Sequence, residues 1–205
     1  IGISRLYCGP AEHGDAIRYP SAPHRGAAPA IVVYNCTPRC NLACAHCYSH
    51  ADDYGPEMTT DQARAMIDDL ADFGVRVLLL SGGEPLLRDD LEDLVRRAAD
   101  RGLRPALSTN GTRLSAERAR RLADAGVAYV GVSLDGSGAA HDAFRGAPGA
   151  FDAALAGLRN ARDAGCKTGV RCTVHCDNAG EVPGLFDLVA DEAFDRLCFY
   201  HLVYA

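Results

Sequence analysis

Three cysteines lie close together at Cys40, Cys44 and Cys47, with the spacing C-x3-C-x2-C. They follow an apolar run at residues 31–34 that is typical of a β-strand. Thiolates are the usual ligands of iron–sulfur clusters, and three of them leave one iron of a [4Fe–4S] cube without a protein ligand. Catalytic metal sites keep such an open position, whereas structural sites are closed. The spacing therefore predicts a cluster that can bind a further molecule.

Zinc is the alternative metal for this segment. A structural zinc ion requires a fourth protein ligand to complete its tetrahedron. His46, His50 or Cys36 could provide that ligand. The segment by itself leaves both metals open.

Composition limits the class of protein. The chain has 205 residues, nine cysteines and a net charge of −6, which gives no reason to expect nucleic-acid binding. No apolar run approaches the roughly 20 residues of a membrane span. The first 15 residues lack the pattern of a signal peptide. We therefore expect a cytoplasmic protein whose cysteines are reduced.

Because the chain starts at Ile1 and stops after an apolar run, we also expect a longer protein whose C-terminal part is missing here.

A repeated pattern of helix, glycine and apolar strand indicates the fold. It occurs around Gly74, Gly102, Gly126 and Gly165, where glycine suits the left-handed position after a helix. The predicted strands lie near residues 31–36, 76–81, 104–108, 128–134, 168–174 and 196–203. The predicted helices lie near residues 60–73, 89–101, 115–125, 150–164 and 182–191. Strict alternation predicts an α/β fold with a parallel sheet, either open or closed into a barrel. Residues 1–28 are expected to form an extended arm, and residues 29–205 the core domain.

The polar motifs follow the ends of predicted strands. They are the cysteine triplet, Ser81-Gly82-Gly83-Glu84-Pro85, Ser108-Thr109-Asn110-Gly111 and Val132-Ser133-Leu134-Asp135-Gly136. In parallel α/β folds, the C-terminal edge of the sheet carries the active site. Two glycines allow close approach to the backbone, and the Glu84 carboxylate could receive an ammonium group. We therefore expect these motifs to meet at one mouth.

The cysteine triplet, followed one βα unit later by Gly82-Gly83-Glu84-Pro85, resembles the radical S-adenosylmethionine (SAM) superfamily. The resemblance covers residues 30–205 and implies a partial (β/α)6 barrel of the TIM type. It implies that Cys40, Cys44 and Cys47 hold a [4Fe–4S] cluster whose open iron binds SAM. It further implies that one electron from the reduced cluster splits SAM, and that the radical formed takes a hydrogen atom from the substrate.

The same resemblance implies a set of SAM contacts. The Gly82-Gly83-Glu84 segment is expected to hold the methionine amine. His46 is expected to line the adenine, and Thr109, Ser133 and Arg171 to contact other parts of SAM. Plainer interpretations from the residues alone are a turn at Asn110-Gly111 and a helix cap at Asp135.

The flanking segments resemble the tetrapyrrole-modifying branch, which includes the didecarboxysiroheme deacetylase of the alternative heme pathway and the d-type heme biosynthesis protein. This implies a tetrapyrrole substrate that loses two acetate side chains, and a low-potential electron donor such as flavodoxin or ferredoxin. A second iron–sulfur cluster would use cysteines beyond Ala205. The residues expected to line the substrate side of the site are Arg145, Arg171, His175, Tyr200, His201 and Tyr204.

Two other functions remain as alternatives. One is a peptide-modifying radical SAM enzyme or a maturase with a cysteine-rich C-terminal domain, because such proteins share the same core motifs. The other is a non-catalytic metal-binding module. Cys36, Cys172 and Cys176 are expected to be packing residues, since buried cysteine behaves as a small hydrophobe.

Overall fold

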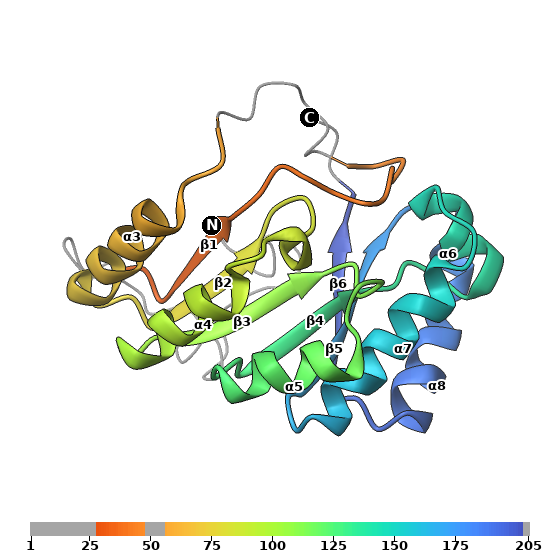
Figure 1. Cartoon of the computed structure of the whole chain (residues 1–205). Coiled ribbons are helices and arrows are strands. Elements are labelled where there is room, and N and C mark those ends of the chain that lie inside the picture. The colour runs from red at the N-terminus through yellow and green to blue at the C-terminus, as the bar shows by residue number, and fades with distance from the viewer. Residues whose placement is uncertain (1–27, 48–55, 203–205) are drawn as a thin grey trace, which may run out of the picture.

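Six parallel strands form one sheet in the order β1 to β6, with no pairing between the two edge strands (Figure 1). The computed structural model describes residues 28–47 and 56–202. The strands are β1 (Ile31–Asn35), β2 (Val77–Ser81), β3 (Arg104–Thr109), β4 (Tyr129–Ser133), β5 (Lys167–Val174) and β6 (Arg196–His201). The prediction of an α/β half-barrel is confirmed. The predicted N-terminal arm lies almost wholly outside the described residues, as do His50 and Tyr204.

Helices connect successive strands and cover the outer face of the sheet (Figure 1). They are α3 (Thr60–Phe73), α4 (Leu91–Asp100), α5 (Ala116–Asp124), α6 (Gly138–Arg145), α7 (Ala150–Asp163) and α8 (Val182–Asp191), with short 3-10 helices η2 (Pro85–Leu87) and η3 (Ala179–Glu181). None of the helices that the structure describes is both long and apolar enough to span a bilayer.

The predicted helix signals act as expected. Thr59 and Gln62 form a capping box at the start of α3, and the Ser115 side chain accepts a hydrogen bond from the Arg118 N–H at the start of α5. The glycines of the repeated pattern all have positive φ; Gly74 at 92° is one of them. Each glycine therefore lets the chain turn from a helix into the next strand.

The two faces of the sheet differ in character. Side chains that point outward, such as Leu78, Leu80 and Leu107, are fully buried beneath the helices and form the core. Side chains of alternate residues point into the half-barrel. There Gly131 pairs in register with Gly169, and Ser133 with Arg171. The apolar core therefore lies between sheet and helices, and the inner face is left for chemistry.

Helix α6 was not among the predicted helices. It has only eight residues and begins at Gly138 without a side-chain cap. A short helix that starts with glycine gives a weak sequence signal. Gly146 ends it in the left-handed conformation, with φ of 69°. The position of α6 matters because its last turn reaches the cysteine loop.

Gly157 in α7 offers a test of the packing behind the site. A Cβ atom at this position would lie 2.2 Å from the carbonyl oxygen of Gly111, in the turn after β3. Alanine normally stabilises a helix interior relative to glycine. Here we expect Gly157→Ala to lower the free energy of unfolding by about 1–3 kcal/mol, because overpacking outweighs helix propensity. Urea unfolding of the metal-free protein would measure it. Gly180→Ala, with open space around the added atom, is the control. Equal stability of both variants would contradict the packing argument.

Candidate metal and cofactor site

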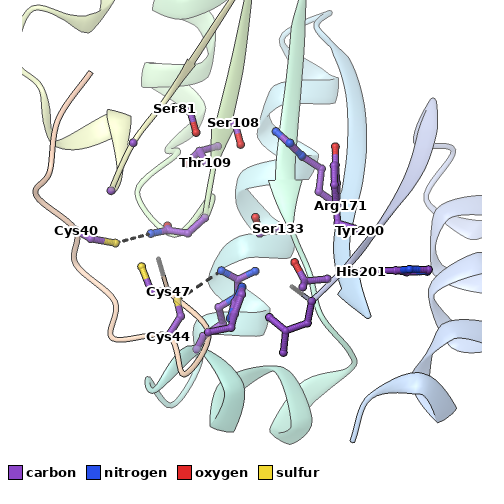
Figure 2. Close-up of a pocket in the computed structure, with 17 residues that line it drawn as sticks. Cys40, Cys44, Cys47, Ser81, Ser108, Thr109, Ser133, Arg171, Tyr200 and His201 are labelled. Carbon is purple, nitrogen blue, oxygen red and sulfur yellow. Dashed lines mark hydrogen bonds between the residues drawn. The ribbon is translucent and has the colours of Figure 1, made fainter. Parts of the chain in front are cut away.

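A cavity of about 400 Å³ opens at the C-terminal edge of the sheet. Its wall contains the three cysteines of the triplet, and Figure 2 shows their sulfur atoms directed toward one region between the loop and the strand ends. Every motif predicted at a strand end contributes to the wall. Besides the cysteines, the residues concerned are Ser81, Gly82, Gly83, Ser108, Thr109, Asn110 and Ser133. The predicted meeting of these motifs at one mouth is confirmed.

The cysteine loop, residues 36–47, has no helix or strand of its own. Its first part is fixed by backbone hydrogen bonds to the end of β2. The N–H of Cys36 donates to the Ser81 carbonyl at 2.8 Å. The N–H groups of Gly83 and Glu84 donate to the carbonyls of Thr37 and Arg39, each at 2.7 Å. The motif after β2 therefore positions the chain that enters the cysteine triplet.

The two glycines are required by this contact. A Cβ atom at Gly82 would lie 2.5 Å from the Thr37 carbonyl oxygen, and one at Gly83 would lie 2.3 Å from that of Arg39. Real Cβ atoms do not approach backbone so closely. The predicted close approach to the glycine backbone is therefore made by the cysteine loop, while the same glycines also line the cavity.

The predicted role of the Glu84 carboxylate as the partner of an ammonium group stays a prediction, because the structure gives this carboxylate other partners. Glu84 is fully buried and is not among the residues of the cavity wall. One oxygen accepts from the Thr109 hydroxyl at 2.6 Å and from the Leu86 N–H at 3.0 Å; the other accepts from the Asn110 N–H at 2.7 Å. Burial raises the pKa of this carboxyl, and these donors oppose the rise. Glu84 therefore joins the ends of β2 and β3.

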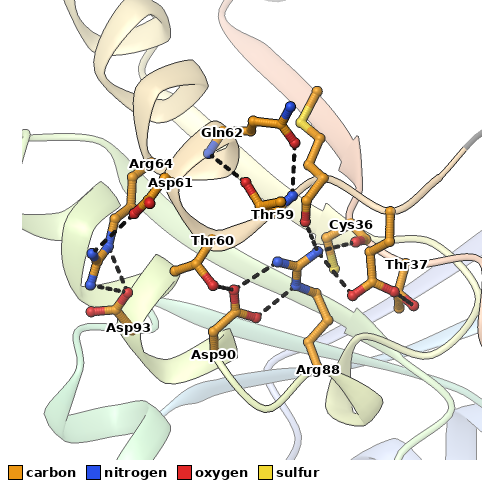
Figure 3. A network of polar contacts seen from close by, with 12 residues as sticks. Cys36, Thr37, Thr59, Thr60, Asp61, Gln62, Arg64, Arg88, Asp90 and Asp93 are labelled. Carbon is orange, nitrogen blue, oxygen red and sulfur yellow. Dashed lines mark hydrogen bonds and ion pairs between the residues drawn. The ribbon is translucent and has the colours of Figure 1, made fainter.

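A second polar network, centred on Arg88, also holds the cysteine loop in place (Figure 3). The Arg88 side chain is 2% exposed and donates to the Cys36 carbonyl at 2.7 Å. It also forms ion pairs with Asp90 at 2.7 Å and with Glu57 at 3.2 Å. Glu57 accepts from the Thr37 hydroxyl at 2.6 Å. Residues on both sides of the cysteine triplet therefore share one buried cation.

His46 lies in the cavity wall, as the SAM-contact prediction requires. Its ring stacks on Phe144 at 4.3 Å, and Phe144 stacks on His175 at 4.2 Å. The buried Nδ1 atom of His46 has no hydrogen-bond partner among the described residues. Burial, with the nearby Arg145, lowers the pKa of His46. Contact with adenine stays a prediction.

Thr109, Ser133 and Arg171 also line the cavity, but their predicted contacts with SAM are not tested by the geometry. The Arg171 guanidinium lies 4.9 Å from the ring centre of Tyr200 on the neighbouring strand. Tyr200 faces the same cavity, whereas the His201 ring points away from the cysteines (Figure 2). Tyr200 and His201, the two sixth-strand candidates that the structure describes, both border the cavity, and of these two Tyr200 turns its ring toward it.

Asp135 and Arg145 form a buried ion pair at the cavity wall. Asp135 does not cap α6, because the N-cap is Ser137. Arg145 is 7% exposed and also donates to the Cys44 sulfur at 3.5 Å. The two terminal nitrogens of Arg145 are engaged by Cys44 and Asp135, and its predicted place on the substrate side stays a prediction. The sequence did not predict this ion pair because it did not predict α6. The available signal for the helix was Arg145 followed by Gly146, a sequence typical of a helix C-terminus.

Among residues 28–47 and 56–202, the remaining cysteines do not complete a closed metal site with the triplet. Cys36 is 2% exposed, and burial raises the pKa of its thiol to about 12. Cys172 is also buried, with its pKa raised by burial to about 11. Both are packing residues, as predicted, whereas Cys176 is exposed, so that prediction is wrong. Among the described residues, only the triplet brings cysteines to the cavity wall. This donor set fits a [4Fe–4S] cluster with one open iron better than closed zinc.

Fold and site together define a half-barrel with a three-cysteine metal centre at its mouth. Residues 34–189 match the model of the radical SAM superfamily, and the chain belongs to this superfamily. Membership implies a [4Fe–4S] cluster and SAM as its cofactors.

The chain is similar to two curated tetrapyrrole enzymes. It is 47% identical over 216 residues to the Fe-coproporphyrin III synthase of Methanosarcina barkeri, covering 100% of this chain and 54% of the relative. It is 47% identical over 195 residues to the pre-heme d1 synthase of Dinoroseobacter shibae, covering 93% and 48%. The chain therefore spans about half the length of these relatives.

Solved structures share the fold. The structure of Streptococcus suis SuiB bound to S-adenosylmethionine superposes with a TM-score of 0.78, covering 87% of this chain and 42% of SuiB. At 16% identity, this likeness supports the half-barrel architecture alone.

The burial of Glu84 leads to a stability prediction. We expect Glu84→Ala to lower the free energy of unfolding of the metal-free protein by at least about 2 kcal/mol, because the buried N–H groups of Leu86 and Asn110 lose their acceptor. Glu84→Gln keeps an acceptor oxygen and should cost less. Urea unfolding of both variants, beside the exposed control Glu117→Ala, would test this. An unfolding free energy unchanged in Glu84→Ala would contradict the structural role.

Proposed function

We propose that this chain is the SAM-binding half-barrel of a radical SAM enzyme that acts on a tetrapyrrole in heme biosynthesis. The observation that carries the proposal is a three-cysteine centre in a cavity whose opposite wall is cationic and aromatic. Cys40, Cys44 and Cys47 would hold the cluster. When bound, the reduced cluster supplies the electron that splits SAM, and the radical that results takes hydrogen from the substrate.

The chain's own residues would bind and orient the cofactor. The backbone of Gly82 and Gly83 lies at the cavity wall and can pair with the amine of SAM. Ser133 and Thr109 offer hydroxyl groups at the ends of neighbouring strands. His46 offers a flat ring on which adenine can stack. We propose these residues, with Arg171, as the SAM contacts, and we leave out the Glu84 carboxylate.

The wall formed by β5 and β6 supports a flat, carboxylate-bearing substrate. In this wall, the Arg171 guanidinium lies over the ring of Tyr200. Arg171 forms no ion pair with a carboxylate in the part of the chain that the structure describes. Guanidinium groups recognise carboxylates, and aromatic rings pack against flat macrocycles. A tetrapyrrole presents both features.

The particular substrate we propose is didecarboxysiroheme, from which two acetate side chains are removed to leave methyl groups. The name of the Methanosarcina barkeri relative, an Fe-coproporphyrin III synthase, places that relative in iron-tetrapyrrole chemistry and supports this choice. We further propose a cytoplasmic location, a low-potential electron donor such as flavodoxin or ferredoxin, and a second iron–sulfur cluster outside this segment.

Removal of one cluster ligand tests the metal site. We expect Cys44→Ala to abolish cluster loading and SAM cleavage, because two thiolates cannot replace three. Iron and sulfide content after anaerobic reconstitution, with deoxyadenosine formation, would measure the effect. Cys176→Ala is the matched control, since this cysteine is exposed and outside the cavity. A Cys44→Ala protein that still cleaves SAM would remove this residue from the ligand set.

The substrate is tested with the full-length protein. After anaerobic reconstitution, the enzyme would be given SAM, dithionite and didecarboxysiroheme, and the products read by mass spectrometry. We expect deoxyadenosine together with a tetrapyrrole that has lost its acetate groups. Deoxyadenosine with an unchanged tetrapyrrole would contradict the substrate and direct the search to peptides. No deoxyadenosine from a loaded cluster would contradict the catalytic proposal itself.

A further inference from the structure

The last turn of α6 meets the cysteine loop through three consecutive residues. The Phe144 carbonyl accepts from the Ala45 N–H at 3.0 Å, and the Phe144 ring stacks on His46. The Arg145 guanidinium donates to the Cys44 sulfur at 3.5 Å. At the next position, a Cβ atom on Gly146 would lie 2.7 Å from the Ala43 carbonyl oxygen. Residues 144–146 therefore lie against residues 43–46 of the loop.

Arg145 brings a positive charge to a cluster ligand. Its side chain is 9% exposed, so water screens the charge weakly. Hydrogen bonds that involve an ionised donor are stronger than neutral ones. The other contact from a described side chain to a ligand sulfur, between the Asn110 amide and Cys40, is neutral and long at 4.0 Å. The three ligands of the cluster are thus not equivalent, and Cys44 has the cationic donor.

Asp135 fixes the guanidinium in this place. Its side chain is fully buried and forms an ion pair with Arg145. One carboxylate oxygen accepts from the Thr173 N–H at 2.7 Å, and the carbonyl accepts from the Asn178 amide at 2.8 Å. The Asp135 N–H donates to His141 Nδ1 at 3.1 Å. Because each polar group of Asp135 has a partner, the ion pair is rigid.

We propose that Arg145 and Asp135 set the reduction potential of the cluster, with Arg145 as a positioning and charge-bearing residue for the Cys44 thiolate. This inference rests on the proposed cluster at Cys40, Cys44 and Cys47. Reduction adds one electron, and hence one negative charge, to the cluster. A hydrogen bond and a positive charge at a ligand sulfur stabilise the reduced form, whereas the Asp135 carboxylate opposes this effect.

The two partners should therefore shift the potential in opposite directions. We expect Arg145→Gln to make the midpoint potential more negative, with the reduction equilibrium changed about tenfold, which is about 59 mV for one electron. We expect Asp135→Asn to make it more positive, because the guanidinium charge is then uncompensated. The double variant should return toward the wild-type value. Disruption of the fold alone would not give shifts of opposite sign.

The measurement is a potentiometric titration of the reconstituted full-length protein, followed by electron paramagnetic resonance, with iron content determined for each variant. Arg97→Gln is the matched control, because Arg97 forms an exposed ion pair with Asp68 at 2.6 Å outside the cavity. Arg145→Lys keeps the positive charge on a shorter side chain. It should therefore shift the midpoint potential less than Arg145→Gln.

Three results would overturn the inference. The first is an unchanged potential in loaded Arg145→Gln, and the second is a shift of the same sign in both single variants. The third is loss of the cluster in every variant, including Arg145→Lys, which would make the pair purely structural. Failure of the wild-type protein to load a cluster would instead contradict the proposed function, so the two failures can be told apart.

Discussion

The backbone contact between the end of β2 and the cysteine loop is the constraint on which the site depends. A loop of twelve residues without regular structure cannot by itself hold three sulfur atoms in place. Two hydrogen bonds of 2.7 Å, from Gly83 and Glu84 to the loop carbonyls, continue the pairing of β1 and β2 beyond the sheet. The glycines permit this because no side chain separates the two backbones. The Glu84 carboxylate then joins β2 to β3, so the sheet edge itself becomes the support of the metal centre.

Two further contacts complete the support, and each comes from a different direction. Arg88 contacts Cys36, which precedes the cysteine triplet in sequence, and Glu57, which follows it. Helix α6 lies against the part of the loop that carries Cys44 and His46. A cluster needs fixed ligands because its electronic properties depend on the groups around the sulfur atoms. The chain therefore places charge and hydrogen bonds near the metal with elements that are far apart in sequence.

On the inner face of the half-barrel, small residues leave space for large side chains. A Cβ atom at Gly169 would lie 2.2 Å from the Tyr129 hydroxyl oxygen, so the tyrosine lies across the inner face of the sheet at this glycine. Arg196 then stacks over Tyr129, and Arg171 over Tyr200. Cationic and aromatic groups thus gather on β4, β5 and β6, while the cysteines approach from the side of β1. The cavity is lined by the cysteines on one side and by Arg171 and Tyr200 on the other.

The sequence by itself determined the parallel sheet, the positions of its strands and the meeting of the motifs at one edge. These features depend on local periodicity, on caps such as Thr59 and on turn glycines such as Gly74, all of which act over a few residues. It also predicted that the three cysteines lie together, because their spacing is short, and all three line the cavity.

Only the tertiary structure decided what the polar side chains near those cysteines do. Whether Glu84 faces a ligand or the core depends on Thr109 and Asn110, more than twenty residues away. Whether Arg145 is free depends on Asp135 and Cys44, which α6 brings to it, and this helix has weak local signals. The role of a buried charge depends on the groups that the tertiary structure places next to it. The amino-acid sequence alone does not show which groups these are.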